Sequence, residues 1–264
     1  MKVTSNDAEI FCEVCGKGRP LVLLHPFPVN HELWLPVAEL LATRYQVILP
    51  DLRGHGQSSV GNGPATMEKH ARDVAAVCDA AGIGKAFFGG ISIGGYVLME
   101  FWRRFRERVA GLMLFDTRAA ADTEEGRAGR LMSADAVERD GPETFIDGLI
   151  PKLIGQTTRT NRPGLVAAAR AMMMKASAAG IASVLRGMAA RPDSTPTLST
   201  INVPVLVIAG EEDELTPVAD SQFMQQRIAK SKLQVIPRAG HYSIFEQHED
   251  AARIVRQFLA ELNY

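Results

Sequence analysis

One segment of this chain reads Ala86-Phe87-Phe88-Gly89-Gly90-Ile91-Ser92-Ile93-Gly94-Gly95, an apolar run that leads through small residues into an amphipathic pattern. Gly90, Ser92 and Gly94 form G-x-S-x-G, which is typical of a strand that turns sharply into a helix with the serine at the apex. Glycine suits the positions two residues from the serine, because side chains there would clash in so tight a turn. The pattern predicts a nucleophilic Ser92, although a glycine-rich turn before a helix can also be only a turn.

A serine nucleophile needs partners that this segment does not contain. The hydroxyl is a poor nucleophile near neutral pH, so it requires a base and a carboxylate that orients the base. The turn itself would direct the backbone N–H of Ile93 and the start of the next helix at the space around Ser92, where negative charge would develop. The rest of the chain therefore has to supply an acid, a base and a second backbone donor.

The composition is that of an ordinary globular protein. Hydrophobic residues make up 46% and charged residues 22% of the 264 residues, enough to bury a substantial core. The 29 basic residues nearly balance the 30 acidic ones, so charge indicates no affinity for nucleic acid or a membrane surface. The N-terminal residues show no apolar segment of the kind that a secretory signal or a membrane span needs, and we expect a cytoplasmic location.

The three cysteines favour a reducing compartment over a disulfide scaffold, because their number is small and odd. Cys12 and Cys15 form a C-x-x-C pair, which is the spacing of some zinc and redox sites. No second pair follows and the segment is typical of a strand, so we expect buried or edge thiols there and no metal site.

Apolar runs and helical patterns alternate along most of the chain. Short apolar runs predict strands, and residues 2–14 predict an antiparallel hairpin with its turn at Asn6-Asp7. Strands are predicted at 21–24, 47–49, the run before Ser92, 112–115, 205–208 and 233–236, and helices at 33–43, 65–81, from Ser92 to about 108, 217–228 and 249–262. This alternation predicts a parallel sheet that is covered by helices on both faces.

The alternation stops between 118 and 196, where only helical patterns occur. These patterns cover about 123–139, 142–154, 163–175 and 177–190. We interpret residues 118–196 as a helical cap inserted into one core domain, which consists of residues 1–117 and 197–264. Charges in the cap are nearly balanced and require no charged substrate, although one buried arginine could bind a carboxylate. Of Met172–Met174, some could line a pocket, while at least one should pack elsewhere.

Candidates for the acid and the base follow the last two predicted strands, since ligands of open parallel sheets bind beyond the carboxyl ends of the strands. Asp213 lies in the acidic loop after the first of these strands, and His241 lies in the loop after the second. His241 would take the Ser92 proton through one ring nitrogen and donate from the other to Asp213. The acidic loop could instead be only a solvated helix cap, and Asp116, which also follows a strand, is an alternative acid.

A second backbone donor is expected on the loop His25-Pro26-Phe27-Pro28, which follows an early predicted strand. Phe27 is the candidate, because the two prolines have no N–H and restrict the backbone on either side of it. The N–H groups of Phe27 and Ile93 would then form an oxyanion hole beside Ser92. A proline-rich turn that merely ends a strand is the alternative.

Five motifs occur in the order in which the α/β-hydrolase superfamily carries them, and the chain resembles that superfamily from about residue 10 to 262. They are the serine turn, the His25–Pro28 loop, the loop Asp51-Leu52-Arg53-Gly54-His55-Gly56-Gln57-Ser58, the segment 210–217 and the pair Gly240-His241. The chain is similar to small bacterial serine esterases, enol-lactonases of the 3-oxoadipate type and cofactor-free haloperoxidases or perhydrolases. Many members have His-Gly where this chain has His25-Pro26, and the loop with Arg53 and His55 is mainly structural in the family.

The resemblance implies an α/β-hydrolase fold, with a mostly parallel central sheet, helices on both faces and an inserted helical cap. It implies a catalytic triad of Ser92, Asp213 and His241, oxyanion donors at Phe27 and Ile93, and no cofactor or metal. We expect a serine hydrolase that cleaves a small carboxylic ester or lactone through an acyl-enzyme, with no nucleic-acid or membrane partner. Two alternatives stay open: perhydrolysis or acyl transfer from the same acyl-enzyme, and a non-catalytic ligand-binding member.

Overall fold

The central feature of the structure is an eight-stranded sheet with the strand order β1-β2-β4-β3-β5-β6-β7-β8. The computed structural model describes all 264 residues. The strands are β1 (Lys2–Ser5), β2 (Ala8–Cys15), β3 (Arg19–Leu24), β4 (Tyr45–Pro50), β5 (Ala86–Ile91), β6 (Val109–Phe115), β7 (Val205–Gly210) and β8 (Ser231–Ile236). Only the pairs β1–β2 and β2–β4 are antiparallel, so the predicted hairpin and the mostly parallel sheet are confirmed.

The middle strands are apolar because both of their faces are covered. Every residue of β5 and β7 is buried, as expected for parallel strands between two helical layers. The core helices are α1 (Leu35–Leu41), α2 (Met67–Ala80), α3 (Ile93–Phe105), α10 (Val218–Arg227) and α12 (His248–Glu261). Helix α1 packs with α12 and α2 packs with α3. The sequence predicted these helices. The short segments η1 (His31–Trp34) and η2 (Arg106–Arg108) overlap the ends of predicted helical ranges, whereas α9 (Thr195–Leu198) and α11 (Ser243–Glu246) were not predicted.

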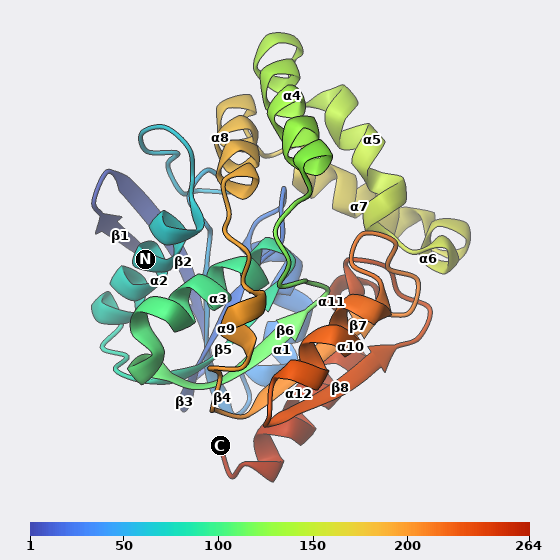
Figure 1. Cartoon of the computed structure of the whole chain (residues 1–264). Helices are drawn as coiled ribbons and strands as arrows, with labels where there is room; N and C mark the ends of the chain where they lie inside the picture. The colour runs from blue at the N-terminus through green and yellow to red at the C-terminus, as the bar shows by residue number, and fades with distance from the viewer.

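Six helices separate β6 from β7, and the first five of them lie together above the sheet in Figure 1. They are α4 (Glu124–Asp140), α5 (Glu143–Leu153), α6 (Gln156–Asn161), α7 (Pro163–Met173) and α8 (Ala178–Ala189). Four of them were predicted, and α6 is the addition. We call residues 118–196 the cap, and these two boundaries remain predictions.

Helix α8 attaches the cap closely to the core. A Cβ at Gly187 would lie 1.8 Å from the Ala65 carbonyl oxygen, so only glycine lets the two backbones approach this far. The Ala65 N–H donates to the Ser183 carbonyl over 3.1 Å, and the Ser183 hydroxyl donates to the Gly63 carbonyl over 2.8 Å. Helix α4 packs along α8, so α4 is held to the core through α8.

None of the helices taken singly is both long and apolar enough to cross a membrane. Only the bent pair α7 and α8, whose axes differ by 92°, reaches that length and composition when the two are joined.

Candidate active site

Ser92 lies at the sharp turn between β5 and α3, as predicted. Its backbone has φ 54° and ψ −115°, a left-handed conformation that a serine adopts only under constraint. The Ser92 N–H donates to the Phe115 carbonyl over 3.0 Å, and the Thr117 hydroxyl donates to the Ser92 carbonyl over 2.8 Å. A Cβ at Gly90 would lie 2.5 Å from the Gly94 carbonyl, so the spacing of glycines in the motif is required by contact across the turn.

His241 and Asp213 form a buried pair at the ends of β8 and β7. The His241 Nδ1 lies 2.8 Å from Asp213 Oδ2. Asp213 Oδ1 accepts the backbone N–H groups of Leu215 and Thr216, and the Thr216 hydroxyl donates to Oδ2 over 2.6 Å. Burial acts to raise the pKa of Asp213, but the charge of His241 and these hydrogen bonds outweigh it, so the pKa lies below its usual value. The ionised carboxylate therefore fixes the imidazole and leaves Nε2 available as a base.

Asp116 contacts other groups and not His241. Its Oδ1 accepts the Gly210 N–H over 2.7 Å, and its Oδ2 accepts the Ser243 hydroxyl. Full burial, together with the nearby charge of Asp213, raises the pKa of Asp116 well above its usual value. Asp116 thus joins the ends of β6 and β7 to α11, whereas Asp213 is the carboxylate that holds the imidazole.

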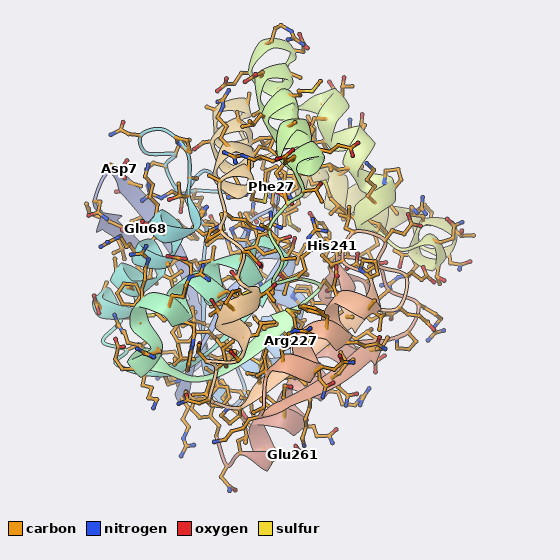
Figure 2. All side chains as sticks on the ribbon, viewed as in Figure 1. Asp7, Phe27, Glu68, Arg227, His241 and Glu261 are labelled. Carbon is orange, nitrogen blue, oxygen red and sulfur yellow. The ribbon has the colours of Figure 1, made fainter.

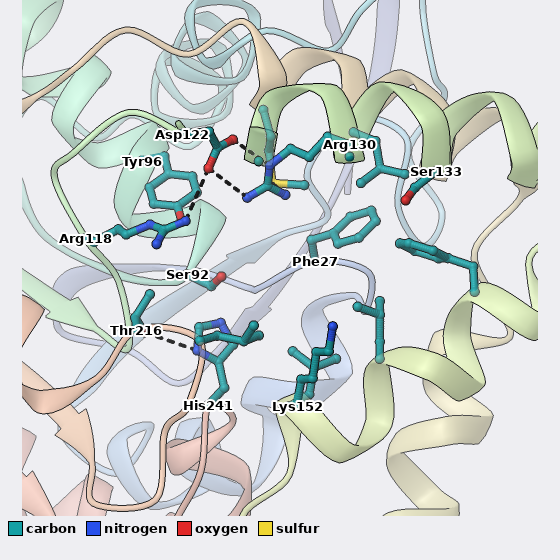
Figure 3. Close-up of a pocket in the computed structure, with 18 residues that line it drawn as sticks. Phe27, Ser92, Tyr96, Arg118, Asp122, Arg130, Ser133, Lys152, Thr216 and His241 are labelled. Atoms are coloured by element: carbon teal, nitrogen blue, oxygen red, sulfur yellow. Dashed lines mark hydrogen bonds and ion pairs between the residues drawn. The ribbon is translucent and has the colours of Figure 1, made fainter. Parts of the chain in front are cut away.

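Ser92 and His241 line one pocket of about 440 Å³, on which Phe27 also borders (Figure 3). In the wider view, Phe27 and His241 lie between the cap helices and the sheet, far from peripheral residues such as Glu261 (Figure 2). The Ser92 hydroxyl makes no hydrogen bond with His241 in this structure. Catalytic hydrogen bonds are often long or absent in free enzymes and shorten when substrate binds, so this geometry is compatible with the pair.

The His25–Pro28 loop is held from both sides. The Leu52 N–H donates to His25 Nε2 over 2.9 Å, so Nδ1 carries the ring proton and donates to the Pro26 carbonyl over 2.9 Å. Burial lowers the pKa of His25 to about 4, which keeps the ring neutral. The Tyr242 hydroxyl, next to the predicted base, donates to the Phe27 carbonyl over 2.9 Å.

The two predicted oxyanion donors have free N–H groups. The Phe27 N–H has no acceptor within the protein, and Ile93 is the first residue of α3, whose N–H has no intrahelical acceptor. Both residues adjoin Ser92 or its pocket. The arrangement is therefore compatible with two amides that receive one carbonyl oxygen.

The loop from Asp51 to Ser58 has a structural role. The Arg53 guanidinium donates to both oxygens of Asp73, over 2.7 and 2.8 Å, and to Asp7 over 2.9 Å. The His55 ring packs edge-on against His25, with ring centroids 4.9 Å apart. Neither Arg53 nor His55 lines the pocket, which agrees with the structural interpretation of this motif.

The sequence profile of the alpha/beta hydrolase fold matches residues 19–247. The chain belongs to the alpha/beta hydrolase family. The predicted family and fold are thereby confirmed. Among curated proteins, this hydrolase is similar to 3-oxoadipate enol-lactonase 1 of Acinetobacter baylyi, with 30% identity over 92% of this chain and 89% of the relative. It is also similar to a non-heme haloperoxidase of Rhodococcus erythropolis, with 29% identity over 90% and 92% of the two chains.

Two solved structures extend the comparison. A thermophilic esterase from Thermogutta terrifontis, solved with malate bound, superposes on this hydrolase with a TM-score of 0.97 and 38% identity, over 100% of this chain and 99% of the esterase. The enol-lactonase from Burkholderia xenovorans LB400 superposes with a TM-score of 0.92 and 26% identity, over 98% and 100% of the two chains. Structures of esterase and lactonase type thus share the whole architecture of this hydrolase.

Most of the pocket lining was missed by sequence reasoning. Eighteen residues line the pocket, and twelve of them belong to the cap. None of Met172–Met174 is among them, because α7 packs on the outer side of α5 and η1; the methionine that does line the pocket is Met188. Helical spacing did offer one signal, since Tyr96 lies one turn after Ser92 and faces the same pocket.

Proposed function

We propose that this hydrolase cleaves small carboxylic esters or lactones through an acyl-enzyme formed on Ser92. The observation that carries the proposal is the meeting of three chain segments at one pocket. Ser92 at the strained turn and His241, held by Asp213 over 2.8 Å, both line it. Nucleophile, base and orienting acid are the constellation that activates a hydroxyl for attack on a carbonyl carbon.

In the proposed reaction, each step uses one of these groups or the two backbone amides. The Ser92 oxygen bonds to the carbonyl carbon while its proton passes to His241 Nε2. The carbonyl oxygen becomes an oxyanion and accepts the N–H groups of Phe27 and Ile93. When the carbon–oxygen bond to the leaving group breaks, His241 returns the proton to that oxygen. A water molecule then repeats the sequence on the acyl-enzyme and releases the acid.

The named relatives include an enol-lactonase and an esterase, so we favour esters and lactones over other carbonyl compounds as substrates of this hydrolase. A pocket of about 440 Å³ is at the small end of the range for ligand sites, which favours a small substrate. We also propose that the reaction takes place in the cytoplasm, because the cysteines are few and all three are free, as in proteins of a reducing compartment.

The test replaces the proposed nucleophile, Ser92, and compares this variant with a matched control variant. Ser92→Ala should lower kcat/KM for p-nitrophenyl butyrate by at least roughly 10⁴-fold, whereas Ser199→Ala, at an exposed serine outside the pocket, should retain full activity. A fluorophosphonate should add its mass to the wild type and to Ser199→Ala but not to Ser92→Ala. Substantial turnover by folded Ser92→Ala, or no labelling of the wild type, would reject the proposal.

Hydrogen peroxide is a second acceptor to examine, because a non-heme haloperoxidase is among the relatives. Peroxide would attack the same acyl-enzyme and release a peracid in place of the acid. Turnover with peroxide and an ester present, followed as peracid formed per ester consumed, distinguishes the two acceptors. We expect water to be the main acceptor, and a majority of peracid would assign the alternative function.

A further inference from the structure

One wall of the pocket carries more positive than negative charge. Three arginines converge on a single carboxylate, Asp122, and we call these four residues the arginine cluster. Asp122 lies 3.2 Å from Arg118, 2.6 Å from Arg130 and 2.6 Å from Arg191. Within the cluster three guanidinium groups face one carboxylate, while Asp220 and Asp193 act on Arg118 and Arg191 from outside it without an ion pair.

The carboxylate of the cluster stays ionised. Burial acts to raise the pKa of Asp122, but its hydrogen bonds to Arg130 and Arg191 outweigh this effect and lower the pKa to about 2. Arg191 is the most buried member of the cluster and does not line the pocket: its side chain is only 3% exposed, lies 4.3 Å above the Tyr96 ring and donates to the Ala120 carbonyl. The cluster donors that border the pocket belong to Arg118 and Arg130.

Arg118 and Arg130 line the pocket and have unused donors (Figure 3). Arg118 donates to Asp122 from one terminal nitrogen, while its buried Nε has no acceptor. Arg130 Nη1 faces only the Met188 sulfur, at 3.5 Å, and a thioether is a weak acceptor. The two side chains are 33% and 23% exposed, so a bound anion would be partly removed from water. Charge-assisted hydrogen bonds are strongest under such conditions.

The position of the cluster indicates which part of the substrate it meets. Figure 3 shows Ser92 between His241 on one side and Arg118 with Tyr96 on the other. His241 must protonate the leaving group, so the leaving group departs on its side and the acyl chain extends toward the arginines. Tyr96 lies four residues beyond Ser92 on α3, which corresponds to a rise of about 6 Å.

We propose that the acyl part of the substrate carries a carboxylate, which Arg118 and Arg130 bind, so that the enzyme cleaves monoesters or lactones of acids with a second carboxyl group. The inference rests on the proposed function and narrows its substrate class. We expect only a few methylene groups between the two carbonyl carbons, because Ser92, Arg118 and Arg130 line one pocket of about 440 Å³. Longer or shorter chains would lose one of the two interactions.

Lys152 is the other cation of the pocket and serves as the comparison. It comes from α5, has no ion pair in the structure and is exposed to solvent. Salt and water screen an exposed charge, so its contribution to anion binding should be small and should fall with ionic strength. The arginine cluster should instead retain its effect in salt, because it is partly buried.

The experiment compares substrates in pairs, and the two members of each pair differ in charge but hardly in shape. Monoethyl glutarate and monoethyl adipate carry the carboxylate, and the ethyl esters of the corresponding monoamides replace it with a neutral carboxamide. We expect the wild type to prefer the anion by about tenfold or more in kcat/KM. Arg118→Gln and Arg130→Gln should each remove most of this preference, by lowering kcat/KM more for the anion than for the amide, and Arg118→Lys should restore part of it. Lys152→Met should change the preference by less than about threefold.

Each outcome bears on the proposal. All rates are referred to the fraction of protein that a fluorophosphonate labels, so a misfolded variant is not counted as an inactive one. Equal kcat/KM for anion and amide in the wild type would overturn the proposal and leave the ester hydrolase function standing. A preference that disappears in Lys152→Met but persists in both glutamine variants would also overturn it. Turnover of neither ester, together with absent labelling, would defeat the proposed function itself.

Discussion

The sheet core and the cap contribute different things to the pocket. The core supplies Ser92, Asp213 and His241 on loops that follow three parallel strands, and backbone contacts hold these loops closely. The cap supplies twelve of the eighteen lining residues, ten from α4, α5 and α8 and two from the loop before α4, and no recognisable motif marks them. Under the proposed function, the core would carry out the chemistry and the cap would select the substrate.

The largest expected effect is the loss of chemistry when the core carboxylate is neutralised. In Asp213→Asn the amide no longer stabilises the imidazolium and can hold the ring in the wrong tautomer, so kcat should fall by about 10⁴-fold. KM should change little, because Asp213 does not line the pocket. Steady-state kinetics on a neutral ester measures both constants. Asp116→Asn is the matched control, and a larger loss there would show that the acid had been assigned to the wrong carboxylate.

A smaller effect is expected on stability, because the core turn and the cap should differ in how well they tolerate an added methyl group. A Cβ at Gly94 would lie 2.7 Å from the Leu24 carbonyl oxygen, whereas a Cβ at Gly148 on α5 would meet nothing within 4 Å. Gly94→Ala should therefore destabilise the fold by about 1–3 kcal/mol, and Gly148→Ala should stabilise it by up to about 1 kcal/mol. Urea unfolding gives both values. Similar values for the two variants would contradict the contrast between a tightly constrained turn and an open cap helix.

The smallest expected effect is the pH dependence of the stability that the arginine cluster of the cap contributes. The folded-state pKa of Asp122, about 2, lies below its ordinary value of 3.8, so the cluster stabilises the protein above pH 4 and loses this contribution as the pH falls toward 2. The difference in unfolding free energy between the wild type and Asp122→Asn should therefore be larger at pH 5.5 than at pH 3.5. Denaturant titrations at the two pH values test this. A difference that is constant with pH would mean that Asp122 contributes through packing and not through charge.

Local sequence patterns predicted the site residues of the core better than those of the cap, for a physical reason. The turn at Ser92 needs glycine at Gly90 and Gly94 because backbone atoms across the turn are in contact, and such a need is visible in a short pattern. Loops after buried strands also had to meet at one edge of a parallel sheet, which predicted the neighbourhood of Asp213 and His241. The cap helices were predicted from their periodicity, but periodicity does not say which face of a helix borders a pocket.

Two details lay beyond any local pattern. Asp213 and Asp116 both follow strands, and only the packing of the loops showed that the former reaches His241 while the latter joins Ser243 and Gly210. Similarly, Met172–Met174 looked suited to a pocket, but α7 packs away from it and Met188 on α8 takes that place.

The amino-acid sequence by itself determined the alternation of strands and helices, the sharp turn at Ser92 and the three loops that carry reactive side chains, since these depend on residues close together in the chain. Only the tertiary structure decided that Arg118, Arg130 and Arg191 gather around Asp122 beside Tyr96. Arg118 and Asp122 share one loop, but Arg130 lies on α4 and Arg191 follows α8, so the three arginines gather only when α4 packs along α8. Interactions between distant segments follow from packing, which no short pattern encodes.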